Sequence, residues 1–259
     1  GLIVLSGKSL TATTGDISVG GELLFNDATP TWGMAGMVIS GNEYTMETSV
    51  GGVSFDSATI ANGKTLTLTS HQDFTMDGAL ATNGTVKIDA GDTAKIGGQT
   101  SNGGTLTING ATIDMGALAS SGNANINSAS DLTIGQIDNT GTLNLVAADS
   151  ITAGAIESNL KLNISAEKLN MAMLTVSGGS AVINAPTITS DDLISVAGNI
   201  THASDVAGAA ASGLSIVGNT NVTAGSLTAT GALMVDTGTV AYDVKNAVAF
   251  TGAANVAAG

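Results

Sequence analysis

The amino-acid sequence predicts an all-β fold, a parallel β-helix or β-solenoid, right-handed and with three short strands in each turn of about 18–21 residues. Three observations predict it. Apolar residues recur about nineteen positions apart, the residues between them alternate apolar and polar with the period of two that is typical of strands, and glycines recur at fixed offsets. One such unit cannot bury its own apolar edge, so successive units must stack on one another.

The apolar positions form columns that are most regular between residues 103 and 174. One column contains Ile108, Ile126, Leu145 and Ile164, which are all branched aliphatic residues. Three further columns run in phase with it: Ile113, Leu132, Ile151 and Leu169; Met115, Ile134, Ala153 and Met171; Leu118, Ile137, Ile156 and Leu174. Stacking places equivalent strands about 4.8 Å apart in parallel, so each column becomes an aliphatic ladder inside the solenoid.

Polar residues and glycines form columns of their own. Outward positions are Thr107, Asn125, Asn144 and Asn163, and also Asp114, Thr133, Thr152 and Asn170. The glycine columns are Gly116, Gly135 and Gly154, and Gly84, Gly104, Gly122 and Gly141. We expect these glycines to supply the positive φ angles that sharp corners need.

The same pattern extends towards both ends of the chain, with two interruptions. Residues 53–63 parallel residues 74–84, Tyr44 and Met46 fit a preceding strand, and apolar residues from Leu10 to Leu23 fit one further turn. Residues 26–40, which contain Pro30, predict a surface loop or cap, and residues 203–213 predict an irregular segment. Because alternation returns after residue 213, the prediction is a single β-solenoid domain over residues 1–259.

Composition argues against several classes of partner. The formal net charge is -14 with seven lysines and no arginine, which opposes binding to nucleic acid or to an anionic membrane surface. The apolar run from Gly1 to Leu5 is too short to span a bilayer, so no membrane-spanning segment is expected. With no cysteine, disulfides and thiolate chemistry are excluded, whereas the redox compartment stays open. Because the residues from Gly1 to Leu5 are apolar and have neither an initiator Met nor a basic flank, we expect a processed, exported protein.

Residues suited to catalysis are few, and the sequence predicts that the protein is not an enzyme. The histidines are His71 and His202, and although Ser70 and Asp73 lie near His71, neighbours in sequence rarely have triad geometry. Pairs of carboxylates are candidates for acid–base catalysis or for a Ca²⁺ site, with solvated surface charge as the simpler interpretation: Asp89 with Asp92, and Asp191 with Asp192. No cofactor is expected.

The phased columns, glycine corners and Asn-Gly and Thr-Gly pairs resemble the passenger solenoids of bacterial autotransporters and filamentous-haemagglutinin-like adhesins, chiefly over residues 41–198. The resemblance concerns architecture and includes no diagnostic motif. It implies a right-handed β-helix, export to the bacterial cell surface or beyond, and a role in adhesion, surface coating or fibre formation. A step of five from Leu132 to Ile137 excludes the strict hexapeptide spacing of left-handed solenoids.

These features predict a structural or adhesive β-solenoid, a subunit of a self-assembling surface fibre or biofilm matrix. The alternative is an ice- or glycan-binding solenoid, and a polysaccharide-active enzyme is a further alternative. For ice binding, Thr65, Thr67 and Thr69 form an outward row, but the column through Thr67 continues as Lys87.

The expected partner is a second copy of the chain, stacked end to end, with a cell-surface glycan or a host surface as a further candidate. The apolar strand Leu2, Ile3, Val4 and Leu5 is the candidate for end-to-end contact. Trp32, Met34 and Met37 are candidates for lateral contact, because exposed Trp and Met are unusual on a polar surface. The alternative is that this loop folds back over an end of the solenoid as a cap.

Overall fold

The computed structural model describes residues 2–5, 8–25, 36–39, 41–196, 199–203, 213–217, 220–229, 232–237, 240–250 and 254–256. Every regular element in these ranges is a β-strand, and the strand pairs are parallel. The chain divides into two compact units, residues 1–129 and residues 130–259. The predicted all-β parallel solenoid is confirmed within each unit, whereas the handedness and the single continuous domain stay predictions.

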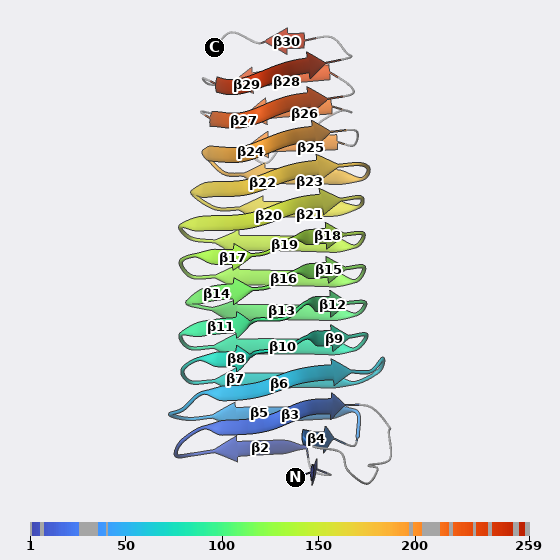
Figure 1. Cartoon of the computed structure of the whole chain (residues 1–259), viewed down its shortest axis with the longest axis vertical. Helices are drawn as coiled ribbons and strands as arrows, with labels where there is room; N and C mark the ends of the chain where they lie inside the picture. Colours follow the sequence, from blue (N-terminus) through green and yellow to red (C-terminus); the bar gives the residue numbers. More distant parts are fainter. Residues whose placement is uncertain are drawn as a thin grey trace. The chain divides into compact units, whose positions relative to one another are not determined.

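Unit 1 contains two parallel sheets (Figure 1). Its sheet A consists of β1 (Leu2–Leu5), β3 (Ile17–Phe25), β4 (Gly36–Ile39), β6 (Val53–Ile60), β8 (Phe74–Met76), β9 (Leu80–Thr82), β11 (Thr93–Ile96), β12 (Thr100–Asn102), β14 (Thr112–Met115) and β15 (Leu118–Ser120). Its sheet B consists of β2 (Ser9–Ala12), β5 (Glu43–Thr48), β7 (Thr65–Ser70), β10 (Thr85–Ala90), β13 (Thr105–Gly110) and β16 (Asn123–Ser128).

A turn of unit 1 runs through one strand of sheet B and then crosses sheet A, which bends in the middle. From β7 to β15 each turn has the predicted three strands, because the bend divides sheet A into two short strands. In β3 and β6 the strand continues through the bend, with a register shift between Val19 and Glu22. The register gives the length of these turns. Leu66 pairs with Val86, and Val86 pairs with Leu106, so equivalent residues are twenty positions apart.

Unit 2 repeats the arrangement. Its sheet A consists of β17 (Leu132–Ile134), β18 (Ile137–Asn139), β20 (Ser150–Ser158), β22 (Lys168–Val176), β24 (Thr187–Val196), β27 (Thr220–Ala229) and β29 (Val240–Phe250). Its sheet B consists of β19 (Thr142–Ala147), β21 (Lys161–Ser165), β23 (Ser180–Asn184), β25 (Asn199–Ala203), β26 (Gly213–Val217), β28 (Ala232–Thr237) and β30 (Ala254–Val256).

The stack of unit 2 is irregular where the sequence loses its alternation. Strand β25 pairs directly with β26, with Ile200 opposite Leu214, and β24 pairs with β27. Ile200 and Leu214 are fourteen residues apart, whereas Ala181 and Ile200, the preceding pair of this column, are nineteen apart. The short step includes no strand of sheet A among the described residues; residues 204–212 of the predicted irregular segment lie outside them.

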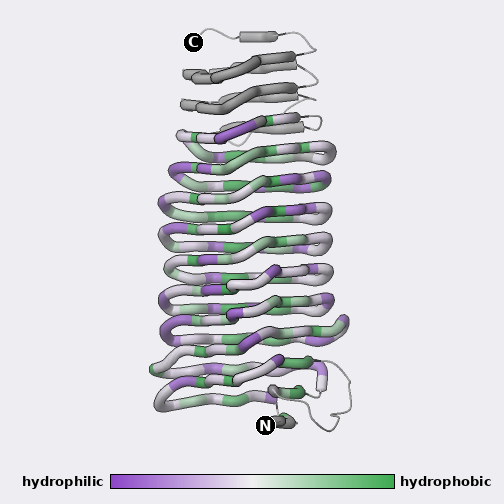
Figure 2. The backbone as a smooth tube through the Cα atoms, viewed as in Figure 1, coloured by the Kyte–Doolittle hydropathy of each residue, from purple (hydrophilic) through white to green (hydrophobic). Residues whose placement is uncertain are grey.

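The core lies between the two sheets and consists of the predicted aliphatic columns. Within unit 1, Leu68, Ile88, Ile108 and Ile126 follow one another in register and are 0–1% exposed. Within unit 2, Ile151 and Leu169 pair in the same way, and both are fully buried. Hydrophobic and hydrophilic residues alternate along the strands, as the predicted period of two requires (Figure 2).

Strand β4 does not continue the regular order in which each turn stacks on the one before it. It follows the segment predicted as a loop or cap, of which residues 26–35 and 40 lie outside the described residues. Residues 36–39 form a strand between β1 and the second half of β3, with Met37 opposite both Ile3 and Leu23. All four of its residues are buried, so this part of the segment is an integral strand of sheet A.

The glycine columns have a different physical cause from the predicted one. Gly84, Gly104, Gly116 and Gly122 do not have positive φ angles; the described glycines with positive φ lie elsewhere, at Gly63 for example. A Cβ atom on Gly104 would lie 2.0 Å from the carbonyl oxygen of Gly84, and one on Gly122 would lie 2.1 Å from that of Gly104. These positions need glycine because adjacent turns approach each other closely, so the prediction of positive φ was wrong.

Candidate functional site

The predicted assembly residues fall in different places. Leu2, Ile3, Val4 and Leu5 form β1, which pairs in parallel with β4. Met37 is 2% exposed and faces the core, so its side chain is not available for lateral contact in this conformation. Trp32 and Met34 lie outside the described residues.

The Ser70, His71 and Asp73 group does not have the geometry of a catalytic triad. The buried Ser70 hydroxyl donates a hydrogen bond to the backbone carbonyl of Asp73, at 2.6 Å, and the backbone N–H of His71 donates to the Thr48 hydroxyl. In the described part of the chain no hydrogen bond joins the His71 ring to either neighbour. The side chain of His202, in β25, lies outside the described residues.

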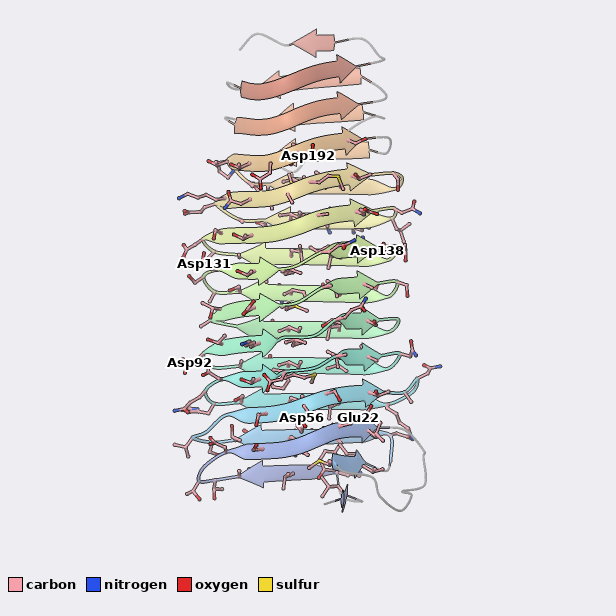
Figure 3. The ribbon with its side chains drawn as sticks, in the orientation of Figure 1. Glu22, Asp56, Asp92, Asp131, Asp138 and Asp192 are labelled. Carbon is pink, nitrogen blue, oxygen red and sulfur yellow. The ribbon has the colours of Figure 1, made fainter. Side chains whose placement is uncertain are left out.

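The candidate carboxylates are partly or fully exposed to solvent. Asp89 forms an ion pair with Lys87, at 2.7 Å, and accepts a hydrogen bond from the Asn109 amide. Asp191 and Asp192 are both exposed in β24. Figure 3 shows Asp92 on a different turn from Glu22 and Asp56 in unit 1, and Asp131 and Asp138 at opposite ends of one turn in unit 2. Over the described residues no three His, Asp or Glu side chains gather as metal ligands would.

At one corner of the turns, aspartates hold the backbone of the next turn. The Asp16 carboxylate accepts a hydrogen bond from the Gly52 N–H at 2.8 Å, and the Asp73 carboxylate accepts one from the Thr93 N–H at 2.9 Å. In unit 2, Asp131 accepts two bonds, from the N–H and the hydroxyl of Ser150. These carboxylates satisfy backbone donors between strands, which is a structural role.

At the opposite corner, two buried asparagines serve the same purpose. The Asn102 amide donates to the Ser120 hydroxyl and to the Asn123 carbonyl, and its oxygen accepts from the Gly104 N–H. Asn139 makes the equivalent three bonds in unit 2 and is fully buried. Each asparagine therefore links its own turn to the next one at the point where the chain enters sheet B.

Beside the asparagine corner of unit 1 lies a groove of about 500 Å³ that crosses four turns. We call it the corner groove. It is lined by Asn62, Gly63, Lys64, Thr65, Asn83, Gly84, Thr85, Gly103, Gly104, Thr105, Gly122 and Asn123. Gly84, Gly104 and Gly122 form its floor, and there the closely stacked backbones exclude a Cβ atom.

One rim of the corner groove is a regular column of hydroxyl groups. Thr65, Thr85 and Thr105 pair in register at the start of β7, β10 and β13, and Asn123 continues the column. The three hydroxyls have no hydrogen-bond partner among the described residues, and the three threonines are partly or fully exposed. They are therefore free to bind a ligand or water.

The lining of the corner groove contains no carboxylate, in a chain with 21 acidic residues. Its one ionic side chain is Lys64, which is 5% exposed. The Lys64 ammonium donates to the Gly41 carbonyl at 2.6 Å and to the Asn42 side chain, and it lies over the Phe25 ring. Because the ammonium is buried and engaged, the groove presents neutral polar groups to the solvent.

Sequence reasoning identified the glycine columns but missed the corner groove. The available signal was the repeated order of glycine and then threonine at equal spacing, as in Gly84-Thr85 and Gly104-Thr105. We interpreted such glycines as corners, and the threonines as strand-forming residues. Only the stacking distance shows that a glycine floor leaves a continuous groove.

Comparisons with protein families, with curated proteins and with solved structures find no match for the chain. Of the resemblance to autotransporter passengers and haemagglutinin-like adhesins, the structure supports the parallel β-solenoid architecture. The regular elements of the described residues are strands, and no helix there is long and apolar enough to cross a membrane.

Proposed function

We propose that the protein is a structural and adhesive β-solenoid of the bacterial cell surface or extracellular matrix, a subunit of a self-assembling fibre without catalytic activity. The observation that carries the proposal is the edge of sheet B at β2. Of the strands that the structure describes, β5 pairs with β2 on one side and none pairs with it on the other.

The core beside this edge is incompletely covered. Leu10 of β2 is half-buried, whereas Met46, Leu68 and Ile88 in the same column are 0–1% exposed. An open strand edge with a partly exposed apolar ladder is a template for pairing with another strand. A parallel ladder is also periodic, so a second copy that stacks in register continues both the hydrogen bonds and the core.

The remaining parts of the proposal have separate support. The acidic surface, the absence of cysteine and the polar outward columns agree with an exported protein. Two observations favour a non-catalytic role: the described residues contain no cluster of three or more His, Asp or Glu side chains, and Ser70 and His71 lack triad geometry. The apolar strand β1 is a second candidate for the end-to-end contact between two copies of the chain.

The experiment that tests the proposal blocks the β2 edge without removing its bonds to β5. The carbonyls of Lys8 and Ala12 accept hydrogen bonds from Thr45 and Ser49, and the alternation of a parallel ladder therefore turns the N–H of Thr11 away from β5. Thr11→Pro removes that outward N–H, and Thr11→Val is the matched control that keeps it.

We expect the natural chain and Thr11→Val to form fibres in negative-stain electron microscopy, and Thr11→Pro to remain monomeric in analytical ultracentrifugation. Circular dichroism checks that both variants keep their β-structure. Fibres of Thr11→Pro that match those of the natural chain would contradict the proposed contact, and a natural chain that stays monomeric at high concentration would contradict self-assembly.

A further inference from the structure

We propose that the corner groove of unit 1 binds an extended, uncharged polysaccharide chain. The inference gives the adhesive role proposed above a ligand class and a site. It rests on the adhesive part of that proposal and is independent of fibre formation, because the groove lies within one unit of one chain.

The shape of the groove fits a linear polymer. It crosses four consecutive turns, so the rim column from Thr65 through Thr85 and Thr105 to Asn123 extends about 14 Å at the spacing of stacked strands. Its glycine floor cannot be filled by side chains, since a Cβ atom on Gly104 or Gly122 would lie within 2.0–2.1 Å of a backbone oxygen. The groove is therefore preformed, which reduces the entropy lost when a ligand binds.

The polar groups of the groove fit a ligand rich in hydroxyls. The hydroxyls of Thr65, Thr85 and Thr105 are both donors and acceptors and lack partners among the described residues. The exposed side chains of Asn62, Asn83 and Asn123 add amide donors and acceptors to the lining. A sugar repeats its hydroxyls along the chain, and the rim repeats its own groups once per turn.

Charge and backbone bonding exclude the other classes of polymer. A polyanion finds no free cation, because the Lys64 ammonium is buried against Gly41 and Asn42. A polycation finds no carboxylate in the lining. An extended peptide finds no open strand edge there, since the N–H groups of Thr85, Thr105 and Asn123 already donate to the preceding turn.

The groove contains no aromatic side chain on which a sugar ring can stack. Binding must therefore come from hydrogen bonds along the rim and from contact with the backbone floor. Such contacts are individually weak, and repetition over several turns gives the affinity. A hexasaccharide should bind at least tenfold more tightly than a disaccharide of the same sugar.

The test uses ¹⁵N-labelled full chain at a concentration where it is monomeric, titrated with cellohexaose, maltohexaose and, as an acidic control, hexagalacturonate. We expect a neutral hexasaccharide to cause saturable shifts in the amide signals of Thr65, Thr85 and Thr105, and hexagalacturonate to bind at least tenfold more weakly. Because binding is measured on monomers, a failure to form fibres does not affect the result.

Matched triple variants separate the groove from the rest of the same surface. Thr65→Val, Thr85→Val and Thr105→Val together remove the rim hydroxyls, and we expect at least a tenfold loss of affinity. The control combines Thr67→Val, Thr69→Val and Thr107→Val, which lie outside the groove lining in β7 and β13, two of the three strands that the rim variant changes. It should bind within twofold of the natural chain.

Three results would overturn the inference: no saturable shift with either neutral hexasaccharide, shifts confined to residues outside the corner groove, or an equal loss of affinity in the two triple variants. The shift map of the natural chain decides the matter even if a triple variant folds poorly.

Discussion

Replacement of Gly104 by alanine tests the physical reason for the glycine columns. The added Cβ atom would lie 2.0 Å from the carbonyl oxygen of Gly84, whereas an ordinary contact begins at 3.4 Å. The two turns must therefore separate locally by the difference, 3.4 minus 2.0, or about 1.4 Å. Because Gly104 does not have a positive φ, strain in its own backbone is not the cause.

The energetic cost follows from the bonds that this separation breaks. Thr105 N–H donates to the Gly84 carbonyl at 2.8 Å, and Gly103 N–H donates to the Thr82 carbonyl at 2.7 Å. An increase of about 1.4 Å takes both beyond the range of a hydrogen bond. Loss of two bonds, with their groups left poorly solvated, gives a destabilisation of about 4 kcal/mol.

The matched control is Gly20→Ala, because Gly20 lies in β3 with nothing within 4 Å of its built Cβ and without a positive φ. That variant should be as stable as the natural chain, or more stable by about 0.5 kcal/mol through the lower entropy of the unfolded chain. Urea unfolding followed by far-UV circular dichroism measures both. If Gly104→Ala unfolds within about 1 kcal/mol of Gly20→Ala, close stacking is not the reason for the column.

Three further predictions concern buried polar groups. Thr100→Val should raise the free energy of unfolding in urea by about 1 kcal/mol, because the Thr100 hydroxyl is fully buried and has no hydrogen-bond partner among the described residues. An unchanged or lower value would mean that the hydroxyl is satisfied. Asn139→Ala should lower the free energy of unfolding by about 3 kcal/mol through three lost bonds, against less than 0.5 kcal/mol for the exposed Asn62→Ala, and similar values for both would refute the corner role. Burial raises the pKa of the Tyr44 hydroxyl above its usual 10.0, so Tyr44 ionises at lower pH in the unfolded chain than in the folded one. The free energy that neutral Tyr44 contributes to folding is therefore fully present below about pH 10, and it is lost as pH rises through the folded pKa. Tyr44→Phe should therefore lose less stability than the natural chain between pH 8 and pH 11, and equal losses would contradict this.

The sequence was sufficient to predict the repeating interior because one rule governs it. Each apolar residue has to cover the equivalent residue of the next turn, so spacing alone identifies the partners. Ile151 opposite Leu169 and Ile88 opposite Ile108 follow from that rule. The polar register through Thr67, Lys87 and Thr107 was predicted in the same way, and it is confirmed.

Features that interrupt the equal spacing, or that depend on how one turn covers another, could not be predicted from this rule. Strand β4 pairs with β1 and β3 because residues 36–39 are inserted on the side of β3 that faces away from β6. A column of equal steps has no place for such an insertion, so Met37 was predicted on the surface and is buried. The corner asparagines were missed for a related reason, since Asn102 and Asn139 resemble turn residues in sequence and are buried only because the next turn covers them.

The corner groove depends both on the regular stacking of the turns and on details that the spacing did not predict, because the same contacts that stack the turns also create its floor. Side chains on Gly104 or Gly122 would disrupt the stack, so the floor is set by stability. The rim is different: Thr65 and Thr85 project from strands whose backbone bonds do not involve their hydroxyls. Rim residues can therefore change with little effect on unfolding while they alter which neutral polymer binds, and a solenoid of this kind can acquire new ligands without altering its core.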